Sequence, residues 1–138
     1  MKCSALLLAT ILFAPLHLSA QSIQKTLVKA FNLDQIHQVD FQLPGEVEVS
    51  HWHQPYLCIE LSIELGTSNE GVFKRLLTSG RYNLLGVVED GKMTIEAPSM
   101  GRVLYFSDGT SLQEKITYKV YLPSTVELKF GELARKSR

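Results

Sequence analysis

The sequence predicts an all-β or β-dominated fold: a twisted or solenoid-like sheet of antiparallel or mixed strands with one short helix. Apolar and polar residues alternate over much of the chain after residue 21, and successive side chains of a strand point to opposite faces of a sheet. Pairs of turn-forming residues separate these runs, as is typical of sheet proteins. One segment, near residues 69–79, has apolar residues at helical spacing instead.

In chain order, β-branched and aromatic residues first predict weak strands at residues 27–31 and 39–43. A turn at Pro44-Gly45 precedes clearer alternation at residues 46–50. The clearest strand runs over residues 57–65, because every odd position there is an aliphatic residue and every even position carries a thiol, hydroxyl or carboxylate. This run is the strongest structural prediction that the sequence allows.

The helical segment lies between Ser68 and Gly80. Ser68 or Asn69 can cap its start, Phe73 and Leu76 belong to an apolar face at helical spacing, and Gly80 can end it. We expect a helix at about residues 69–79 that covers an apolar face of the sheet; a recognition helix is the alternative interpretation.

Strands are expected next at residues 82–88 and 93–97. The pair Asp90-Gly91 between them is typical of a primed two-residue hairpin turn, so Val88 and Met93 should lie close together. Further strands are expected at residues 103–106, 116–122 and 126–128.

The first twenty residues resemble a secretory signal peptide. Lys2 precedes an apolar run over residues 5–14, and small residues end at Ala20. The run is shorter than the roughly 20 apolar residues that span a bilayer. We expect cleavage after Ala20, which leaves residues 21–138 as a single exported β-rich domain in the periplasm or at the cell surface. The residue after the cut is Gln21 rather than cysteine, so lipid attachment is not expected.

The composition of the 118 residues that remain after removal of the leader limits which bonds and partners are possible. Cys58 becomes the only cysteine, so no intramolecular disulfide is expected. Loss of Lys2 leaves 13 basic and 14 acidic residues, a balance that disfavours nucleic acid as a partner. No apolar run after residue 21 is long enough for a transmembrane helix. The basic tail over residues 129–138 is interpreted as a solvated end, with a docking role as the alternative.

Two histidines are the first candidate site. His51 and His53 flank Trp52, and imidazoles two residues apart on a strand project from one face, where they can share Zn²⁺ or Cu²⁺. A zinc site normally needs three protein ligands, and His37 is the only other histidine after the leader. The pair also falls at the end of an alternating run. We therefore expect no metal here, and a metal or small-ligand site at this end remains the alternative.

Candidates for catalysis are few. No Gly-x-Ser-x-Gly stretch occurs. Cys58 lies beside Glu60, and a neighbouring carboxylate disfavours the thiolate that a nucleophile requires. Glu60, Glu64 and Glu96 could act as an acid and base pair, but each falls on the polar phase of an expected strand. We expect no catalytic residue and no cofactor.

Four aromatic residues form the last candidate. Trp52, Tyr105, Tyr118 and Tyr121 could build a platform for carbohydrate or for another protein. Aromatic residues in strands more often pack in the core or across strands, so core packing is the favoured interpretation.

Several strand and turn segments follow one another in a recognisable order, namely residues 31–36, 39–41, 45–50, 56–60, 90–96 and 120–128. Together they resemble the auto-transporter adhesin heads, or GIN domains, of exported bacterial proteins. The resemblance implies a twisted or solenoid-like β architecture, export to the periplasm or cell surface, and no catalytic residues to carry over. Residues 68–82 form an insertion relative to that pattern.

The sequence therefore favours a non-catalytic, exported structural or interaction module. Its expected partner is another envelope protein or a second copy of the chain, bound through open sheet edges. The first alternative is a periplasmic protein that binds a small ligand or metal at the end containing His51 and His53. An unrecognised hydrolase is the second alternative.

Overall fold

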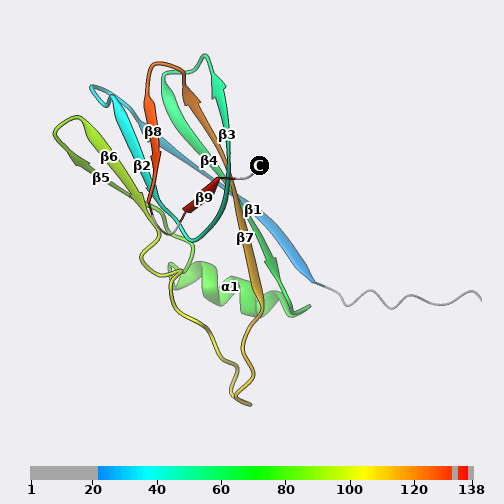
Figure 1. Cartoon of the computed structure of the whole chain (residues 1–138). Coiled ribbons are helices and arrows are strands. Elements are labelled where there is room, and N and C mark those ends of the chain that lie inside the picture. Colours follow the sequence, from blue (N-terminus) through cyan, green and yellow to red (C-terminus); the bar gives the residue numbers. More distant parts are fainter. Residues whose placement is uncertain (1–21, 132–133, 137–138) are drawn as a thin grey trace, which may run out of the picture.

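The computed structural model describes residues 22–131 and 134–136, so the expected leader lies outside the described residues. Figure 1 shows two layers of strands with one helix near their lower end. The β-dominated fold class is confirmed. The elements are β1 (Ile23–Asn32), β2 (Gln38–Gln42), β3 (Gly45–Trp52), β4 (Tyr56–Leu65), α1 (Glu70–Thr78), β5 (Leu85–Glu89), β6 (Lys92–Glu96), β7 (Glu114–Pro123), β8 (Glu127–Phe130) and β9 (Ala134–Lys136).

The strands form two mixed sheets. Sheet I has the order β1-β4-β7-β3-β9, and sheet II has the order β5-β6-β2-β8. In sheet I, β4 pairs antiparallel with both β1 and β7, whereas β3 pairs parallel with β7 and β9. In sheet II, β2 pairs parallel with β6 and β8, and β5 closes one margin as an antiparallel hairpin with β6. Strand β7 therefore separates β3 from β4, although these two strands are consecutive in the chain.

The parallel strands are stacked as three coils. The pairs β6 and β7, β2 and β3, and β8 and β9 each consist of one strand in sheet II followed by one strand in sheet I. All three strands of each stack run in the same direction, because β2 and β3 are parallel to both of their neighbours. The solenoid-like character expected from the sequence resides in these coils, and the antiparallel strands β1, β4 and β5 extend the two sheets on one side, beyond the coil of β6 and β7.

The core lies between the two sheets. The odd residues of β4 all face inwards, as the alternation predicted, and Leu57, Ile59 and Leu65 are fully buried. Sheet II contributes Phe41 and Ile95, which are also fully buried. Burial of one aliphatic or aromatic side chain contributes roughly 1.5–3 kcal/mol. The hydrophobic effect therefore fixes which face of each strand turns inwards.

The helix forms where the capping residue and the spacing of apolar residues predicted it. The side chain of Asn69 accepts a hydrogen bond of 2.9 Å from the backbone N–H of Gly71, so Asn69 is the N-cap. Phe73 is the buried residue of the helix, and its ring stacks on that of Tyr82 with 6.1 Å between centroids. The expected range of about residues 69–79 is confirmed, with the helix running over Glu70–Thr78.

The hairpin between β5 and β6 is also confirmed. Asp90 and Gly91 have φ angles of 50° and 74°, as a type I′ turn requires, and Val88 pairs with Met93. Gly91 packs so closely against His37 that a Cβ atom would lie 2.6 Å from the imidazole.

Three local expectations differ from the structure. The strand expected at residues 82–88 begins only at Leu85, because the chain first turns to bury Tyr82 and Leu84. The strand expected at residues 103–106 is reduced to one isolated bridge, between Tyr105 and Ser111. The basic tail is not merely a solvated end, since its residues contribute to β8 and β9.

In the part of the chain that the structure describes, α1 is the only helix, and it is too short and too polar to cross a bilayer.

Leu57 tests the account of the core. We expect Leu57→Ala to lower the free energy of unfolding by about 2–5 kcal/mol, because it leaves a cavity at a fully buried site. Val28→Ala is the control, since Val28 is 65% exposed on an outer face and its loss should change stability by about 0.5 kcal/mol or less. Urea denaturation measures both, and equal effects would contradict the assignment of inner and outer faces.

Candidate interaction surface

The margins of the two sheets are the first candidate surface. Strands β1 and β9 form the margins of sheet I, and β5 and β8 form those of sheet II. A margin presents backbone N–H and C=O groups that another strand can pair with, and proteins usually guard against such pairing. The described margins differ in length, with ten residues in β1, five in β5, four in β8 and three in β9. They differ in charge as well.

The long margin of β1 is guarded by two lysines. Lys25 and Lys29 pair with Ile63 and Ile59, so they lie on the inward phase of the strand. The Nζ atom of Lys25 is 3.5 Å from an oxygen of Glu70 and 5.9 Å from the centre of the Phe73 ring. Inward-pointing charge on an edge strand would be desolvated by an incoming strand. The β1 margin is therefore unfavourable for strand addition.

The margin of β5 carries no such guard. Leu85, Val87 and Val88 are 51%, 44% and 58% exposed, and the only charged residue of the strand is Glu89 at its end. The hairpin has a two-residue turn, and the pair next to such a turn is hydrogen-bonded within the hairpin. Because this pattern alternates along the strand, the backbone groups of Gly86 and Val88 face the open side. A short apolar strand with free backbone groups is suited to pairing with another chain.

The second candidate is the segment over residues 97–113, here called the arm, which joins β6 to β7. Figure 1 shows it extending below the two sheets, past α1. Its two halves are joined by backbone hydrogen bonds from Phe106 N–H to Thr110 O (2.7 Å) and from Leu112 N–H to Leu104 O (2.8 Å). A loop of this length with its own internal pairing is uncommon and is often functional.

The tip and sides of the arm are well defined. Asp108 accepts hydrogen bonds from the backbone and side chain of Thr110, and these bonds hold the pKa of its carboxyl below the ordinary value. Leu104 packs back towards the core, whereas Val103 and Tyr105 face solvent and are 65% and 69% exposed. The arm thus presents apolar side chains outwards on an ordered backbone.

A buried polar cluster holds the base of the arm. Arg81, which is 7% exposed, donates hydrogen bonds from Nη2 to Glu114 (2.8 Å) and from Nη1 to the carbonyl of Ser99 (2.6 Å). The hydroxyl of Tyr82 donates to the second oxygen of Glu114 at 2.6 Å. Burial and this hydrogen bond raise the pKa of Tyr82. Ser99 and Glu114 lie at the two ends of the arm, so Arg81 joins both ends to the turn after α1.

The base of the arm borders a recess of about 300 Å³, which Arg81, Arg102 and Glu114 help to line. The Nε atom of Arg81 is buried without a hydrogen-bond partner in the described chain, but it is also inaccessible to solvent. The carboxylate of Glu114 already neutralises the guanidinium. The arrangement is therefore that of a structural clasp on the arm.

The aromatic candidates are divided by the structure. Trp52 and Tyr121 come together on the outer face of sheet I, with ring centroids 5.5 Å apart. Tyr56 completes this cluster with an edge contact at 4.9 Å and accepts a hydrogen bond from the Trp52 indole at its carbonyl oxygen. Tyr118 is instead buried between the sheets, where burial and the charge of Glu114 raise its pKa. Tyr105 lies on the arm. The four residues form no single platform, and the local cluster closes the connection between β3 and β4.

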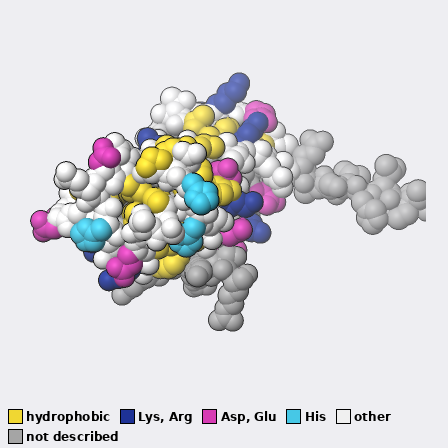
Figure 2. Space-filling model, turned by 90° about the horizontal axis from the view of Figure 1, so that it is seen from above, with side chains coloured by type: hydrophobic (Ala, Val, Ile, Leu, Met, Phe, Trp, Pro, Cys, Tyr) yellow, Lys and Arg dark blue, Asp and Glu magenta, His cyan; other side chains and the backbone are white. Residues whose placement is uncertain are grey.

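The histidine pair lies at a strand end. His51 is the penultimate residue of β3 and His53 follows the strand, and both are exposed. Figure 2, which views the molecule from above, shows histidine side chains among hydrophobic ones on this surface. No group of three or more potential metal ligands occurs among the described residues. The structure therefore does not supply the third ligand that the zinc interpretation requires.

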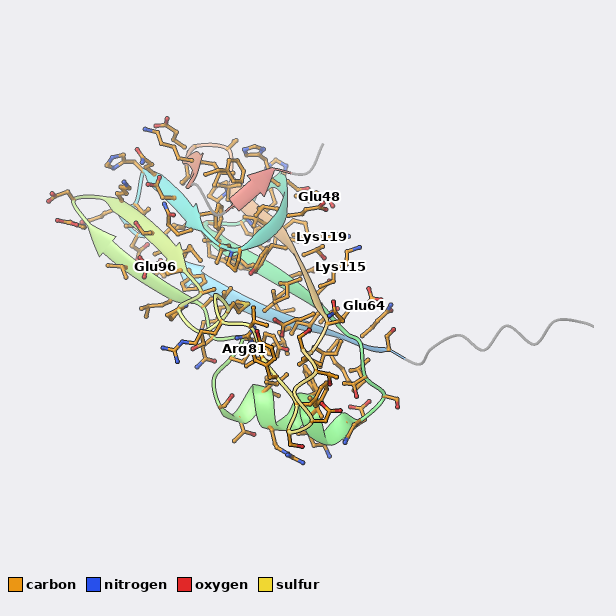
Figure 3. The ribbon with its side chains drawn as sticks, turned by 60° about the horizontal axis from the view of Figure 1, so that its bottom comes forward. Glu48, Glu64, Arg81, Glu96, Lys115 and Lys119 are labelled. Carbon is orange, nitrogen blue, oxygen red and sulfur yellow. The ribbon has the colours of Figure 1, made fainter. Side chains whose placement is uncertain are left out.

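The acidic candidates are divided between the two sheets, with Glu60 and Glu64 on the outer face of sheet I and Glu96 in sheet II. Figure 3 shows Glu48, Lys119, Lys115 and Glu64 along one side of the molecule, and Glu96 on the other sheet. Along β4, four residues separate Glu60 from Glu64, which corresponds to about 13 Å at the usual rise of a strand. Glycosidase carboxylates lie roughly 5–9.5 Å apart. The three acids of the sequence hypothesis thus do not form an acid and base pair.

The outer face of sheet I also carries a shallow polar recess of about 460 Å³. A row of hydroxyls crosses its floor, because Thr26 pairs with Ser62 and Ser62 pairs with Thr117. Glu64 and Lys115 border the row as a cross-strand pair. These groups can donate hydrogen bonds to a polar molecule and accept them from it, and they lie on a solvated face.

Cys58 lies on the same outer face. Partial burial, and secondarily the charge of Glu60, raise the pKa of its thiol. A raised pKa favours the thiol over the thiolate at neutral pH, and the effect of Glu60 has the direction that the sequence predicted.

No family model matches the chain, and no curated protein matches it. The solved structures that are similar to part of it include the following two. A candidate cell adhesion protein from Clostridium sporogenes ATCC 15579 matches 78% of this chain and 46% of its own, with a TM-score of 0.47 and 9% identity. A candidate adhesin from Bacteroides fragilis NCTC 9343 matches 81% of this chain and 42% of its own, with a TM-score of 0.41 and 11% identity. The matched region spans less than half the length of either protein.

Sequence reasoning missed the arm, its clasp and Tyr56. The 18 residues between the expected strands at 93–97 and 116–122, of which only 103–106 were expected to form a strand, would have indicated the arm, had the length of this run been weighed. The clasp leaves no local pattern, because Arg81 and Glu114 are separated by 33 positions.

The clasp makes a stability prediction. We expect Arg81→Met to lower the free energy of unfolding by about 3–5 kcal/mol, because it leaves the carboxylate of Glu114 buried without its partner. The double variant Arg81→Met, Glu114→Gln should lose less, since no unpaired charge remains. Arg102→Met, an exposed arginine of the same arm, is the control and should change stability by about 0.5 kcal/mol or less. Thermal and urea unfolding measure these differences, and a double variant less stable than Arg81→Met would contradict the account.

Proposed function

We propose that this chain is a non-catalytic interaction module, exported to the periplasm or the cell surface, that binds other polypeptides by strand addition at the β5 margin. The observation that carries the proposal is the contrast between two margins. Inward-pointing lysines guard β1, whereas β5 exposes three apolar side chains and free backbone groups. In strand addition, backbone hydrogen bonds supply affinity and alternate side chains supply specificity.

The chemistry of the described surface supports binding over catalysis. The buried polar groups of the clasp are engaged with one another, and they hold the arm instead of opening into a reactive pocket. Of the acidic side chains considered as catalytic candidates, Glu60 and Glu64 lie four residues apart on β4 and Glu96 lies on the other sheet. Export is the part of the proposal that rests on the leader-like residues 1–20 alone.

Export is tested with the full chain in a bacterial host. We expect the chain to be recovered outside the cytoplasm with Gln21 at its amino terminus, as measured by fractionation and mass spectrometry. Ile11→Arg should retain the chain in the cytoplasm uncut, because a charge interrupts the apolar run that the export machinery recognises. Gln24→Arg, beyond the cut, is the control and should leave export unchanged. Full-length chain in the cytoplasm of the unaltered strain would contradict the proposal.

Strand addition is tested with a photo-crosslinking amino acid placed at residue 88 or, as the control, at residue 28. Both positions are exposed valines on edge strands, and only the first lies on the unguarded margin. We expect protein adducts at residue 88 after irradiation of living cells and few at residue 28. Mass spectrometry identifies whether the captured chain is a foreign protein or a second copy. Absence of adducts at residue 88, or equal yields at the two positions, would contradict binding at β5.

A further inference from the structure

The β5 margin and the arm fit each other. Five of the eight large hydrophobic side chains that are most exposed in the described chain belong to these two places, namely Leu85, Val87, Val88, Val103 and Tyr105. Scattered surface hydrophobics are normal, but two concentrated apolar sites on one chain call for a partner. In Figure 1 the β5 and β6 hairpin and the arm point away from each other, so they are free to contact different molecules.

The arm has an open backbone edge of its own. Leu104 and Phe106 use their backbone groups in hydrogen bonds to the other half of the arm. Because backbone groups alternate in direction along an extended segment, those of Tyr105 face the opposite, open side. Tyr105 is also the more exposed of the two outward side chains of the arm.

From this geometry we infer that the arm of one copy adds as a strand to the β5 margin of the next copy, so that the chain assembles head to tail. The inference rests on the proposed function and names its partner as a second copy of this chain. An antiparallel register that sets Arg102 opposite Glu89 also sets Val103 opposite Val88 and Tyr105 opposite Gly86.

This register satisfies the backbone and the charges together. Gly86 and Val88 are the residues of β5 whose backbone groups face outwards, and they fall opposite the outward-facing groups of the arm. Arg102 and Glu89 are both exposed, and neither forms an ion pair within the described chain. The contact would therefore bring together one unpaired cation and one unpaired anion at the end of an apolar strand pair.

The side chains of the register are also complementary. The ring of Phe31 packs closely over Gly86, where a Cβ atom would lie 3.0 Å from it. An aromatic side chain paired across an edge glycine covers the exposed backbone, and Tyr105 would do so beside Phe31. The remaining pairs, Leu104 with Val87 and Phe106 with Leu85, are apolar on both sides.

A symmetric contact between two β5 strands fits less well. When the pair is centred on Val87, Glu89 of each copy lies opposite Leu85 of the other, and no cation is supplied. It also leaves the arm without a role. The head-to-tail contact differs from it in a measurable way, because a heterologous contact propagates beyond two copies whereas a symmetric contact closes as a dimer.

The test uses the exported, processed chain in sedimentation velocity experiments over a wide range of concentration. We expect the unaltered chain to grow beyond a dimer as concentration rises. Val88→Lys should abolish growth by placing a charge on the margin, and Tyr105→Asp should abolish it by altering the arm. Both sites are exposed, so the variants should fold, which circular dichroism checks. Val28→Lys is the control and should assemble like the unaltered chain.

Mixing the two inactive variants gives the decisive result. Val88→Lys retains an intact arm and Tyr105→Asp retains an intact margin, so the mixture should form one-to-one dimers that cannot grow. Glu89→Arg or Arg102→Glu alone should weaken assembly by up to about fivefold, and the two together in one chain should restore it. Restoration distinguishes a charge pair from a folding defect.

Several outcomes would overturn the inference. A Tyr105→Asp variant that assembles like the unaltered chain, a mixture that stays monomeric, or growth that stops at a dimer would exclude the head-to-tail contact. A monomeric chain that is nevertheless crosslinked to a foreign protein at residue 88 would exclude the second copy as partner while leaving strand addition intact. Absence of both self-assembly and adducts would contradict the proposed function itself.

Discussion

Backbone pairing is the constraint on which the rest of this structure depends. Once alternate side chains of two sheets are buried against each other, every strand inside a sheet has partners on both sides, and every strand at a margin has a partner on one side only. The three parallel coils extend both sheets from strand to strand, and both sheets remain open at their margins. The margins therefore matter most for what the chain can bind, because the interior formed by the described residues is apolar apart from the clasp.

Two long-range polar features of the described chain, the lysines of β1 and the clasp, affect contact with other chains in opposite ways. Lys25 and Lys29 place charge where an incoming strand would need apolar contact, and Glu70 and two aromatic rings accommodate that charge in the free chain. The clasp does the reverse for the arm, since Arg81 and Glu114 hold both of its ends and leave its outward face free. An ordered arm loses less conformational entropy on binding than a flexible loop would. The lysines of β1 thus disfavour contact with another strand, whereas the clasp holds the arm in a conformation that favours contact.

The sequence predicts the local features of this fold well. The phase of β4, the turn at Asp90 and Gly91, and the cap at Asn69 each depend on residues a few positions apart, and each has the expected form. Strand order does not follow from such patterns. The insertion of β7 between β3 and β4 depends on contacts between residues about 70 positions apart, as in the pairing of Val47 with Tyr118. The clasp, and the strands that the tail forms, were not predicted for the same reason, because both depend on residues far apart in the sequence.

The alternation of inward and outward positions along a strand explains why the character of the sheet margins was harder to predict than the core. Lys25 and Lys29 alternate with Gln24, Thr26 and Val28, and a sequence reader assigns lysines to the solvent face of a strand. They face inwards because Ile23, Leu27 and Phe31 share their phase and must be buried. A charge on the buried phase is locally unfavourable, so its presence twice on the longest margin, and its absence from β5, makes the two margins differ in how readily they can meet other chains. The same reasoning accounts for Val103 and Tyr105, whose exposure lowers solubility and is not offset by any contact within the described chain. Blocking one margin while leaving another open restricts contact to one direction, and a directed contact is what distinguishes assembly from aggregation.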